Sequence, residues 1–170
     1  MHTERLKKIK VLIVDVDGVL TDGGIIIDSN GVETKRFNVQ DGLGLMLWKK
    51  AGYKSAIISA RQSAVVAHRA NDLQIDKFFV GVSPKLSAYD GLLKEWNIKD
   101  EEVCFVGDDL PDLGILSRVG FAASVDNGVF EVKSAVHYVS SKKGGEGAVR
   151  EIIELILKAQ GVNIAQLYDK

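Results

Sequence analysis

The chain has 170 residues, of which 46% are hydrophobic and 26% are charged, and its formal net charge is −1. This length suits one domain with a sizeable core, so residues 1–170 are expected to form a single domain. A net charge this close to zero provides no field that would attract nucleic acid or an anionic membrane surface. We therefore expect neither as a partner.

The N-terminus lacks the apolar segment of a signal peptide, and no apolar run is long enough to span a bilayer. Cys104 is the single cysteine, so it cannot form a disulfide within the chain, and a reducing compartment is the simplest interpretation. These features predict a cytoplasmic protein.

Strand-like and helix-like segments alternate along the chain, which favours an α/β domain with a doubly wound parallel sheet. Short apolar runs predict strands at 9–14, 55–58, 77–80, 102–106, 120–123 and 136–139. Segments between and after them predict helices at 42–51, 63–73, 85–96, 109–119, 128–134 and 147–159. The apolar residues of the last segment recur at helical spacing, as in an amphipathic helix.

A segment between the first strand and the first helix breaks this alternation. Asn30-Gly31 lies between two β-prone runs and predicts a β-hairpin insertion over residues 24–38. The consecutive residues Ile25, Ile26 and Ile27 give both faces of this hairpin apolar groups. A lone hairpin is marginally stable in water, so it should pack either on a second copy of the chain or on its own core.

The first predicted strand ends in two carboxylates, Asp15 and Asp17, followed by Gly18. Residues i and i+2 of a strand point to the same side, so these carboxylates are expected to converge on one spot. Two carboxylates this close repel each other, and a bound cation or a shared proton would relieve the repulsion. The simpler alternative is that one aspartate caps a helix and the other belongs to a turn.

Polar clusters follow four of the predicted strands, and in a parallel sheet they would lie along one edge. The clusters are Asp15 with Asp17, the stretch 59–61 (Ser-Ala-Arg), the stretch 83–85 (Ser-Pro-Lys), and the stretch 107–112 (Gly-Asp-Asp-Leu-Pro-Asp). Carboxylates suit Mg²⁺, whereas the three scattered histidines offer no spacing for zinc. Cations and a hydroxyl beside a metal suit a phosphoryl group. An aspartate can form an aspartyl-phosphate, and a neighbouring carboxyl can act as acid and base.

In this order and spacing, the four clusters resemble the signature motifs of the haloacid dehalogenase superfamily of phosphotransferases. Within it, nearly the whole chain resembles the 3-deoxy-D-manno-octulosonate 8-phosphate phosphatase family, with matching stretches at 19–23, 37–42, 106–110 and 144–150. The resemblance implies a Rossmann-like fold with a β-hairpin insertion and no cap domain. It also implies Mg²⁺-dependent hydrolysis of that sugar phosphate in lipopolysaccharide precursor synthesis.

The resemblance also assigns roles to individual residues. Asp15 would be the nucleophile and a Mg²⁺ ligand, and Asp17 the general acid/base, with its backbone carbonyl on the metal. Ser59 and Lys85 would hold the transferring phosphoryl group. Asp108 would complete the metal site, supported by Asp109 and Asp112. The implied substrate contacts are Asp17, Asn38, Val39, Gln40, Asp41, Gly42, Arg61, Arg69 and Lys85.

Two positions depart from the family, and one bears on the substrate. Ala60 replaces a usual glycine, and Met46 stands where an arginine often contacts substrate. A sibling phosphatase for 2-keto-3-deoxynononate 9-phosphate resembles this chain but carries glutamate at the position of Arg61. Arg61 suits the carboxylate of a sugar acid, because a guanidinium binds carboxylates bidentately. Because the sibling has glutamate there, the resemblance implies that Arg61 favours the eight-carbon substrate, with the nine-carbon one as the alternative.

Members of this family are homotetramers in which the hairpins build a central barrel and a neighbour closes each active site. The resemblance therefore implies a homotetramer through the hairpin 24–38. The tail, residues 162–170, would either reach the active site of a neighbour or fray.

Other interpretations stay open for the whole chain and for single residues. A phosphoacceptor signalling domain also combines paired acids, a hydroxyl and a lysine on such a sheet, and an idle oligomerisation module would keep the fold without activity. Lys85 and Arg69 could be solvated helix residues, Asp22 and Asp41 turn or cap residues, and the glycines of 144–147 a flexible turn. We interpret three hairpin charges as solvated: Glu33, Lys35 and Arg36.

Overall fold

The structure is a computed structural model that describes residues 2–168. Its centre is a six-stranded sheet with the order β5-β4-β1-β6-β7-β8, in which all pairs of neighbours are parallel. The strands are β1 (Val11–Val14), β4 (Lys54–Ile58), β5 (Lys77–Phe79), β6 (Val103–Val106), β7 (Phe121–Ser124) and β8 (Tyr138–Val139). The doubly wound α/β prediction is confirmed.

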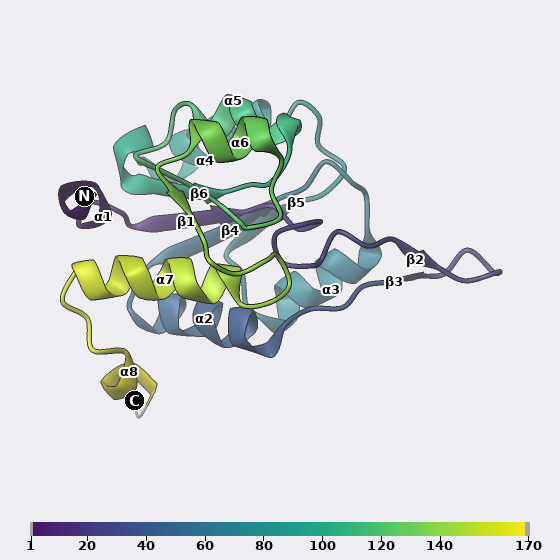
Figure 1. Cartoon of the computed structure of the whole chain (residues 1–170), viewed down its shortest axis with the longest axis horizontal. Helices are drawn as coiled ribbons and strands as arrows, with labels where there is room; N and C mark the ends of the chain where they lie inside the picture. Colours follow the sequence, from purple (N-terminus) through teal and green to yellow (C-terminus); the bar gives the residue numbers. More distant parts are fainter. Residues whose placement is uncertain (1, 169–170) are drawn as a thin grey trace.

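Helices cover both faces of the sheet (Figure 1). One face carries α2 (Val39–Lys50), α3 (Ala64–Asp72) and α7 (Ala148–Ala159), and the other carries α4 (Leu86–Trp96), α5 (Leu113–Leu116) and α6 (Phe130–Ala135). In β1, Leu12 and Val14 join the first core, and Val11 and Ile13 join the second. A strand buried on both faces is apolar throughout, which explains its uninterrupted apolar run.

The predicted helix over 109–119 is shorter in the structure. A 3₁₀ turn, η2 (Leu110–Asp112), precedes the single-turn helix α5. The Asp112 carboxylate accepts the backbone N–H groups of Asp108 and Asp109, which fixes these residues in a turn ahead of the helix. The helix over 128–134 likewise begins later, at Phe130, and most predicted strands lose one or two terminal residues.

Three short elements were absent from the sequence prediction. They are α1 (Thr3–Leu6), the 3₁₀ turn η1 (Asp100–Glu102) and α8 (Ile164–Tyr168). The described part of the tail packs on the chain's own core through Val162, Ile164 and Leu167. Residues 169 and 170 of the predicted tail lie outside the described residues. Over residues 2–168, the chain contains no helix with the length and apolar character needed to cross a bilayer.

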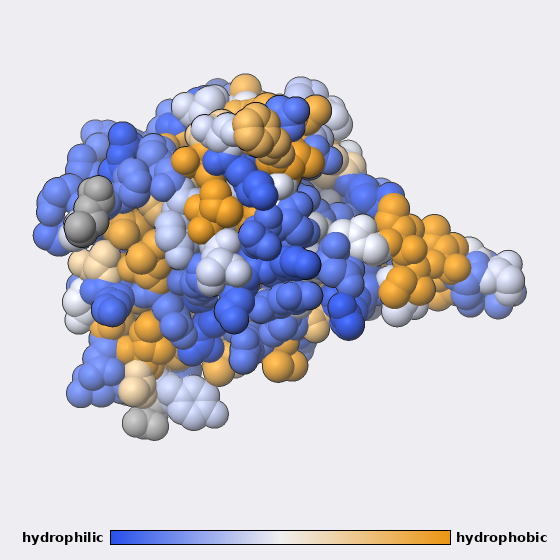
Figure 2. Space-filling model, in the orientation of Figure 1, coloured by the Kyte–Doolittle hydropathy of each residue, from blue (hydrophilic) through white to orange (hydrophobic). Residues whose placement is uncertain are grey.

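The hairpin insertion forms as predicted, with β2 (Ile26–Ile27) antiparallel to β3 (Glu33–Thr34). It projects from the body as a narrow arm (Figure 1). Ile25, Ile26 and Ile27 are 55–58% exposed and form much of the apolar patch on this arm in Figure 2. These side chains therefore do not pack on the core of their own chain. Between Ala60 and Lys85 the described chain holds only α3 and β5, which leaves no room for a cap domain.

Candidate active site

The candidate site lies where the sheet reverses its winding. After β1 the chain adds β4 and β5 on one side, and it then returns to place β6, β7 and β8 on the other. In open α/β sheets, ligands bind at the carboxyl ends of the strands beside such a reversal. The pocket found there brings together all four predicted clusters through Asp15, Asp17, Ser59, Ala60, Arg61, Lys85, Asp108, Asp109, Pro111 and Asp112.

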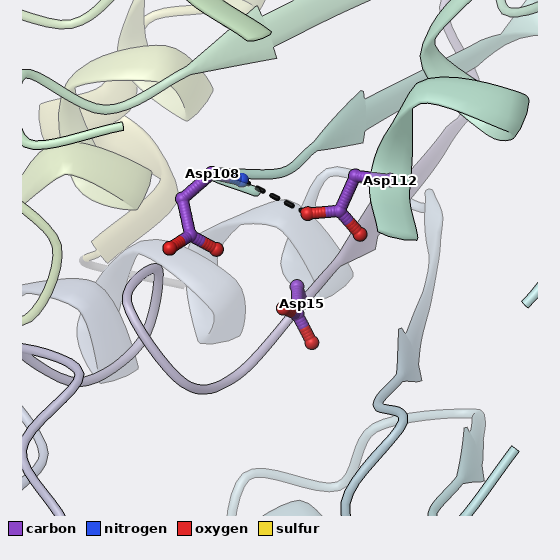
Figure 3. A group of neighbouring side chains, drawn as sticks. All are labelled: Asp15, Asp108 and Asp112. Carbon is purple, nitrogen blue, oxygen red and sulfur yellow. Dashed lines mark hydrogen bonds between the residues drawn. The ribbon is translucent and has the colours of Figure 1, made fainter. Parts of the chain in front are cut away.

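Three of these residues form an acidic cluster. Carboxylate oxygens of Asp15, Asp108 and Asp112 lie within 4.8 Å of one another, around a common space (Figure 3). Asp112 is fixed by the N–H of Asp108, at 2.9 Å. Gly18 has a φ of +90°, and a Cβ there would overlap the Asp108 carboxylate, so only glycine lets the loop after β1 approach so closely.

A single buried cation faces the acidic cluster. Lys85 is 3% exposed, and its Nζ lies 2.9 Å from Asp15 Oδ1 and 2.7 Å from Asp112 Oδ1. Burial lowers the pKa of Lys85, but the two carboxylates outweigh burial, so its pKa is raised and the side chain stays charged. The interpretation of Lys85 as a solvated helix residue is therefore wrong.

The remaining negative charge of the acidic cluster is not balanced. Burial raises the pKa of Asp15 to about 6, and it raises the pKa of Asp108 to about 7 with help from the charges of Asp15 and Asp112. Asp108 Oδ1 is buried and has no hydrogen-bond partner among the described residues. A hard divalent cation with oxygen ligands would supply the missing positive charge. The donor set therefore fits the Mg²⁺ site that the sequence predicted.

Asp17 shares the pocket but not the acidic cluster. Because β1 ends at Val14, the alternation of a strand no longer orients the side chains of Asp15 and Asp17. The Asp17 carboxylate instead forms an ion pair with Lys35 and lies 3.6 Å from Nε of Arg61. The two carboxylates therefore meet at one pocket with different partners.

Two hairpin charges contact residues that line this pocket: Lys35 pairs with Asp17, and Glu33 pairs with Arg61. The Lys35 side chain is 1% exposed, and its Nζ lies 3.2 Å from Glu33 Oε1. Arg61 Nη2 lies 3.2 Å from the same oxygen, and the Ser63 hydroxyl donates to Glu33 Oε2 at 2.5 Å. The interpretation of Glu33 and Lys35 as solvated charges is therefore wrong, whereas Arg36 is exposed and pairs with Asp22.

The predicted substrate residues over 38–42 do not line this pocket. Asn38 caps α2 by accepting the N–H of Gln40 at 2.7 Å, and Val39 is 81% exposed. The buried Asp41 carboxylate accepts the N–H groups of Gly147 and Arg150 at the start of α7. These contacts connect the start of α2 with the start of α7.

Arg69 also lies outside the pocket, on α3. It pairs with Asp72 and packs against α2, where a Cβ on Gly42 would lie 2.5 Å from its Nη2. Met46, the second departure from the family, is 49% exposed on α2, outside the pocket that Ala60 lines.

The glycine-rich stretch 144–147 does more than turn the chain. A Cβ on Gly144 would overlap the carbonyl oxygen of Gly18, and the Gly145 N–H donates to the carbonyl of Val19 at 3.0 Å. This stretch therefore packs directly on the backbone of the loop that carries Asp17.

The fold and the acidic pocket place the protein among the haloacid dehalogenase-like hydrolases, and the model of that family matches residues 81–153. A 3-deoxy-D-manno-octulosonate 8-phosphate phosphatase from Haemophilus influenzae is 40% identical over 158 residues, covering 93% of this chain and 88% of the relative. The chain belongs to the 3-deoxy-D-manno-octulosonate 8-phosphate phosphatase family. It is an enzyme, which contradicts the alternative of a signalling domain.

Solved structures of similar proteins agree with this assignment. The Moraxella catarrhalis phosphatase, solved with a magnesium ion, a phosphate ion and a KDO molecule, is 45% identical with a TM-score of 0.94, covering 99% of this chain and 96% of that chain. The cobalt-bound Haemophilus influenzae phosphatase is 39% identical with a TM-score of 0.92, covering 98% and 99%. Divalent cations are thus bound by proteins that share this fold.

Proposed function

We propose that this protein hydrolyses 3-deoxy-D-manno-octulosonate 8-phosphate to the free sugar acid and phosphate, with Mg²⁺, through an aspartyl-phosphate on Asp15. The observation that carries the proposal is the buried contact of Lys85 with Asp15 inside the acidic cluster. Asp15, Asp108 and the backbone carbonyl of Asp17 would hold the cation, with Asp112 adjoining. A cation bound there would neutralise the carboxylates and draw electron density from a phosphoryl oxygen.

In the first step, an ionised oxygen of Asp15 attacks the phosphorus atom, and the bond from phosphorus to the sugar oxygen breaks. Lys85 and the Ser59 hydroxyl, both in the pocket, hold the phosphoryl oxygens as charge spreads over them. Asp17 acts in this step in its protonated form, unlike the carboxylate that pairs with Lys35 in the structure, and gives its proton to the departing sugar oxygen. The products of this step are the free sugar acid and the phosphorylated Asp15.

In the second step, water attacks the phosphorus atom of the aspartyl-phosphate. Asp17, now ionised, takes a proton from that water, and the bond from phosphorus to the Asp15 oxygen breaks. Inorganic phosphate leaves, and both aspartates return to their starting states. Asp17 suits this double role because it faces the pocket from a different direction than the acidic cluster.

Arg61 is the residue that supports a sugar-acid substrate. Its side chain is 43% exposed at the rim of the pocket, and its planar guanidinium can bind a carboxylate through two hydrogen bonds. The nine-carbon 2-keto-3-deoxynononate 9-phosphate carries the same carboxylate and remains the second candidate. Because the chain belongs to this family, we propose that the enzyme acts in lipopolysaccharide precursor synthesis in the cytoplasm.

The test is a comparison of kcat/KM for the eight-carbon and nine-carbon phosphates, because discrimination lies in that ratio. We expect the eight-carbon phosphate to be preferred. Asp15→Asn should lower kcat by at least about 10³-fold, because the nucleophile is lost, with an unchanged circular dichroism spectrum. Near-normal turnover by this variant would refute the aspartyl-phosphate mechanism.

We also propose that the protein is a homotetramer held together through the hairpin 24–38. The support is the exposed apolar patch of Ile25, Ile26 and Ile27 on the projecting arm. Ile26→Asp should shift the protein to smaller species in light scattering, since burying a charge in an interface is costly. Phe130→Asp, at an apolar position on α6 that is 78% exposed against 55% for Ile26, is the control. A wild type that is monomeric at micromolar concentration would refute the proposal.

A further inference from the structure

Four side chains form a closed ring of alternating charge, which we call the charge ring: Asp17, Lys35, Glu33 and Arg61. Asp17 and Arg61 line the pocket, and Lys35 and Glu33 lie behind them on the arm. Each cation touches both carboxylates, and each carboxylate touches both cations. Two members come from the loop after β1 and the loop after β4, and two come from the arm. The mechanism above uses Asp17 and Arg61, and it leaves Glu33 and Lys35 without a role.

Glu33 is anchored independently of Arg61. The Ser63 hydroxyl donates to its Oε2 at 2.5 Å, and Lys35 contacts its Oε1. Ser63 is also the N-cap of α3, so the carboxylate lies beside a helix N-terminus, where negative charge is favoured. The hydrogen bond from Ser63, with smaller contributions from Lys35 and Arg61, keeps the pKa of Glu33 below its usual value despite burial. Glu33 is thus a fixed anion.

Arg61 depends on this anion for its orientation. Its Nη2 lies 3.2 Å from Glu33 Oε1 and its Nε lies 3.6 Å from Asp17 Oδ2, so one edge of the guanidinium faces the charge ring. The other edge, formed by Nη1 and Nη2, keeps three N–H groups for a ligand. A long, half-exposed arginine otherwise loses side-chain entropy when a ligand orders it, and holding it in place beforehand reduces that loss.

We propose that Glu33 is a positioning residue that orients Arg61, so that its free edge meets the carboxylate of the substrate. The inference rests on the proposed function, in which Arg61 binds that carboxylate. An alternative role, in which Glu33 competes with the substrate for Arg61, fits less well. Glu33 is held by Ser63 and Lys35 and occupies only one edge of the guanidinium.

The experiment compares Glu33→Gln with the wild type on two substrates at saturating Mg²⁺. For the sugar-acid phosphate that the wild type hydrolyses better, KM should rise about tenfold while kcat stays within about twofold, because a bidentate, charge-assisted contact is misaligned. For p-nitrophenyl phosphate, which has no carboxylate, both parameters should stay within about twofold. Arg36→Gln is the control, since it removes a charge next to the charge ring but outside it.

A double-mutant cycle separates positioning from a general structural role. In an Arg61→Met background, Glu33→Gln should change KM by less than about twofold, because the residue it positions is gone. Glu33→Asp keeps the charge on a shorter side chain and should give an intermediate KM. This variant replaces Glu33→Gln in the comparison if Glu33→Gln fails to fold.

Several results would overturn this role. A lower KM in Glu33→Gln would mean that Glu33 competes with the substrate. An equal loss of kcat/KM on both substrates would mean a general structural role. A change in KM that adds to the change caused by Arg61→Met would mean that Glu33 does not act through Arg61. An unchanged KM in Glu33→Gln overturns this role alone. A wild type that hydrolyses neither sugar-acid phosphate overturns the proposed function and this role together.

Discussion

Replacing Asp108 with asparagine is expected to stabilise the metal-free protein while weakening its response to magnesium. Lys85 contacts two of the three carboxylates of the acidic cluster, and it can balance only one negative charge. At an effective dielectric constant of about 20, one unbalanced pair of carboxylates about 5 Å apart costs about 3 kcal/mol. Solvent near Asp108 reduces this to about 2 kcal/mol, which raises Tm by about 4–8 °C in a domain of this size.

The assay is thermal unfolding at pH 8, above the pKa of about 7 that burial and the neighbouring carboxylates give Asp108. In a chelating buffer, Asp108→Asn should melt above the wild type. In millimolar Mg²⁺ the order should reverse, since a ligand that binds only the folded state stabilises it. Asp126→Asn, at an exposed position, is the control and should leave both midpoints unchanged. If Asp108→Asn melts below the wild type in chelator, the repulsion argument for a cation site is wrong.

Two further predictions concern stability away from the carboxylates. Gly144→Ala should destabilise the fold by at least about 3 kcal/mol in a urea titration, because the new methyl group would overlap backbone atoms. The control is Gly91→Ala in α4, where the new methyl group meets open space, and it should be neutral or slightly stabilising. His137 accepts the N–H of Ala122 at 2.9 Å, and burial lowers its pKa from 6.5. The folded state resists a proton that the unfolded state binds, so the contribution of His137 to stability should fall as pH drops through 6.5 and level off below the lowered pKa. The raised pKa values of Asp15 and Asp108 act in the opposite direction, so the measurement is the difference in stability between the wild type and His137→Asn at each pH. A difference that does not change with pH would contradict the assignment.

The centre of the sheet could be predicted because β1, β6 and β7 are buried on both faces and therefore read as continuous apolar runs. The tail helix α8 and the interrupted helix after β6, which consists of η2 and α5, were harder to predict from the sequence. Each is too short to have a clear periodicity, and α8 is held by packing on distant parts of the chain. The turn at η2 depends instead on local contacts, in which the Asp112 carboxylate reaches back to two backbone N–H groups.

The site residues at the ends of the strands could be predicted from the sequence, whereas those on the arm could not. Ser59, Lys85 and Asp108 meet because parallel strands end at one edge. Glu33 and Lys35 are two residues apart, which predicts a shared face of β3, but no local pattern says whether that face meets solvent or the pocket. The direction of the arm relative to the sheet is set by long-range ion pairs, which a single sequence does not reveal.

The contact between Gly144 and the loop after β1 has a consequence for synthesis of the protein. The catalytic loop is translated early, yet the backbone that supports it emerges only after most of the chain has left the ribosome. A nascent chain or a truncated fragment that ends before Gly144 therefore carries the proposed nucleophile without the support of its loop. We expect phosphatase activity only in chains that extend past Gly144.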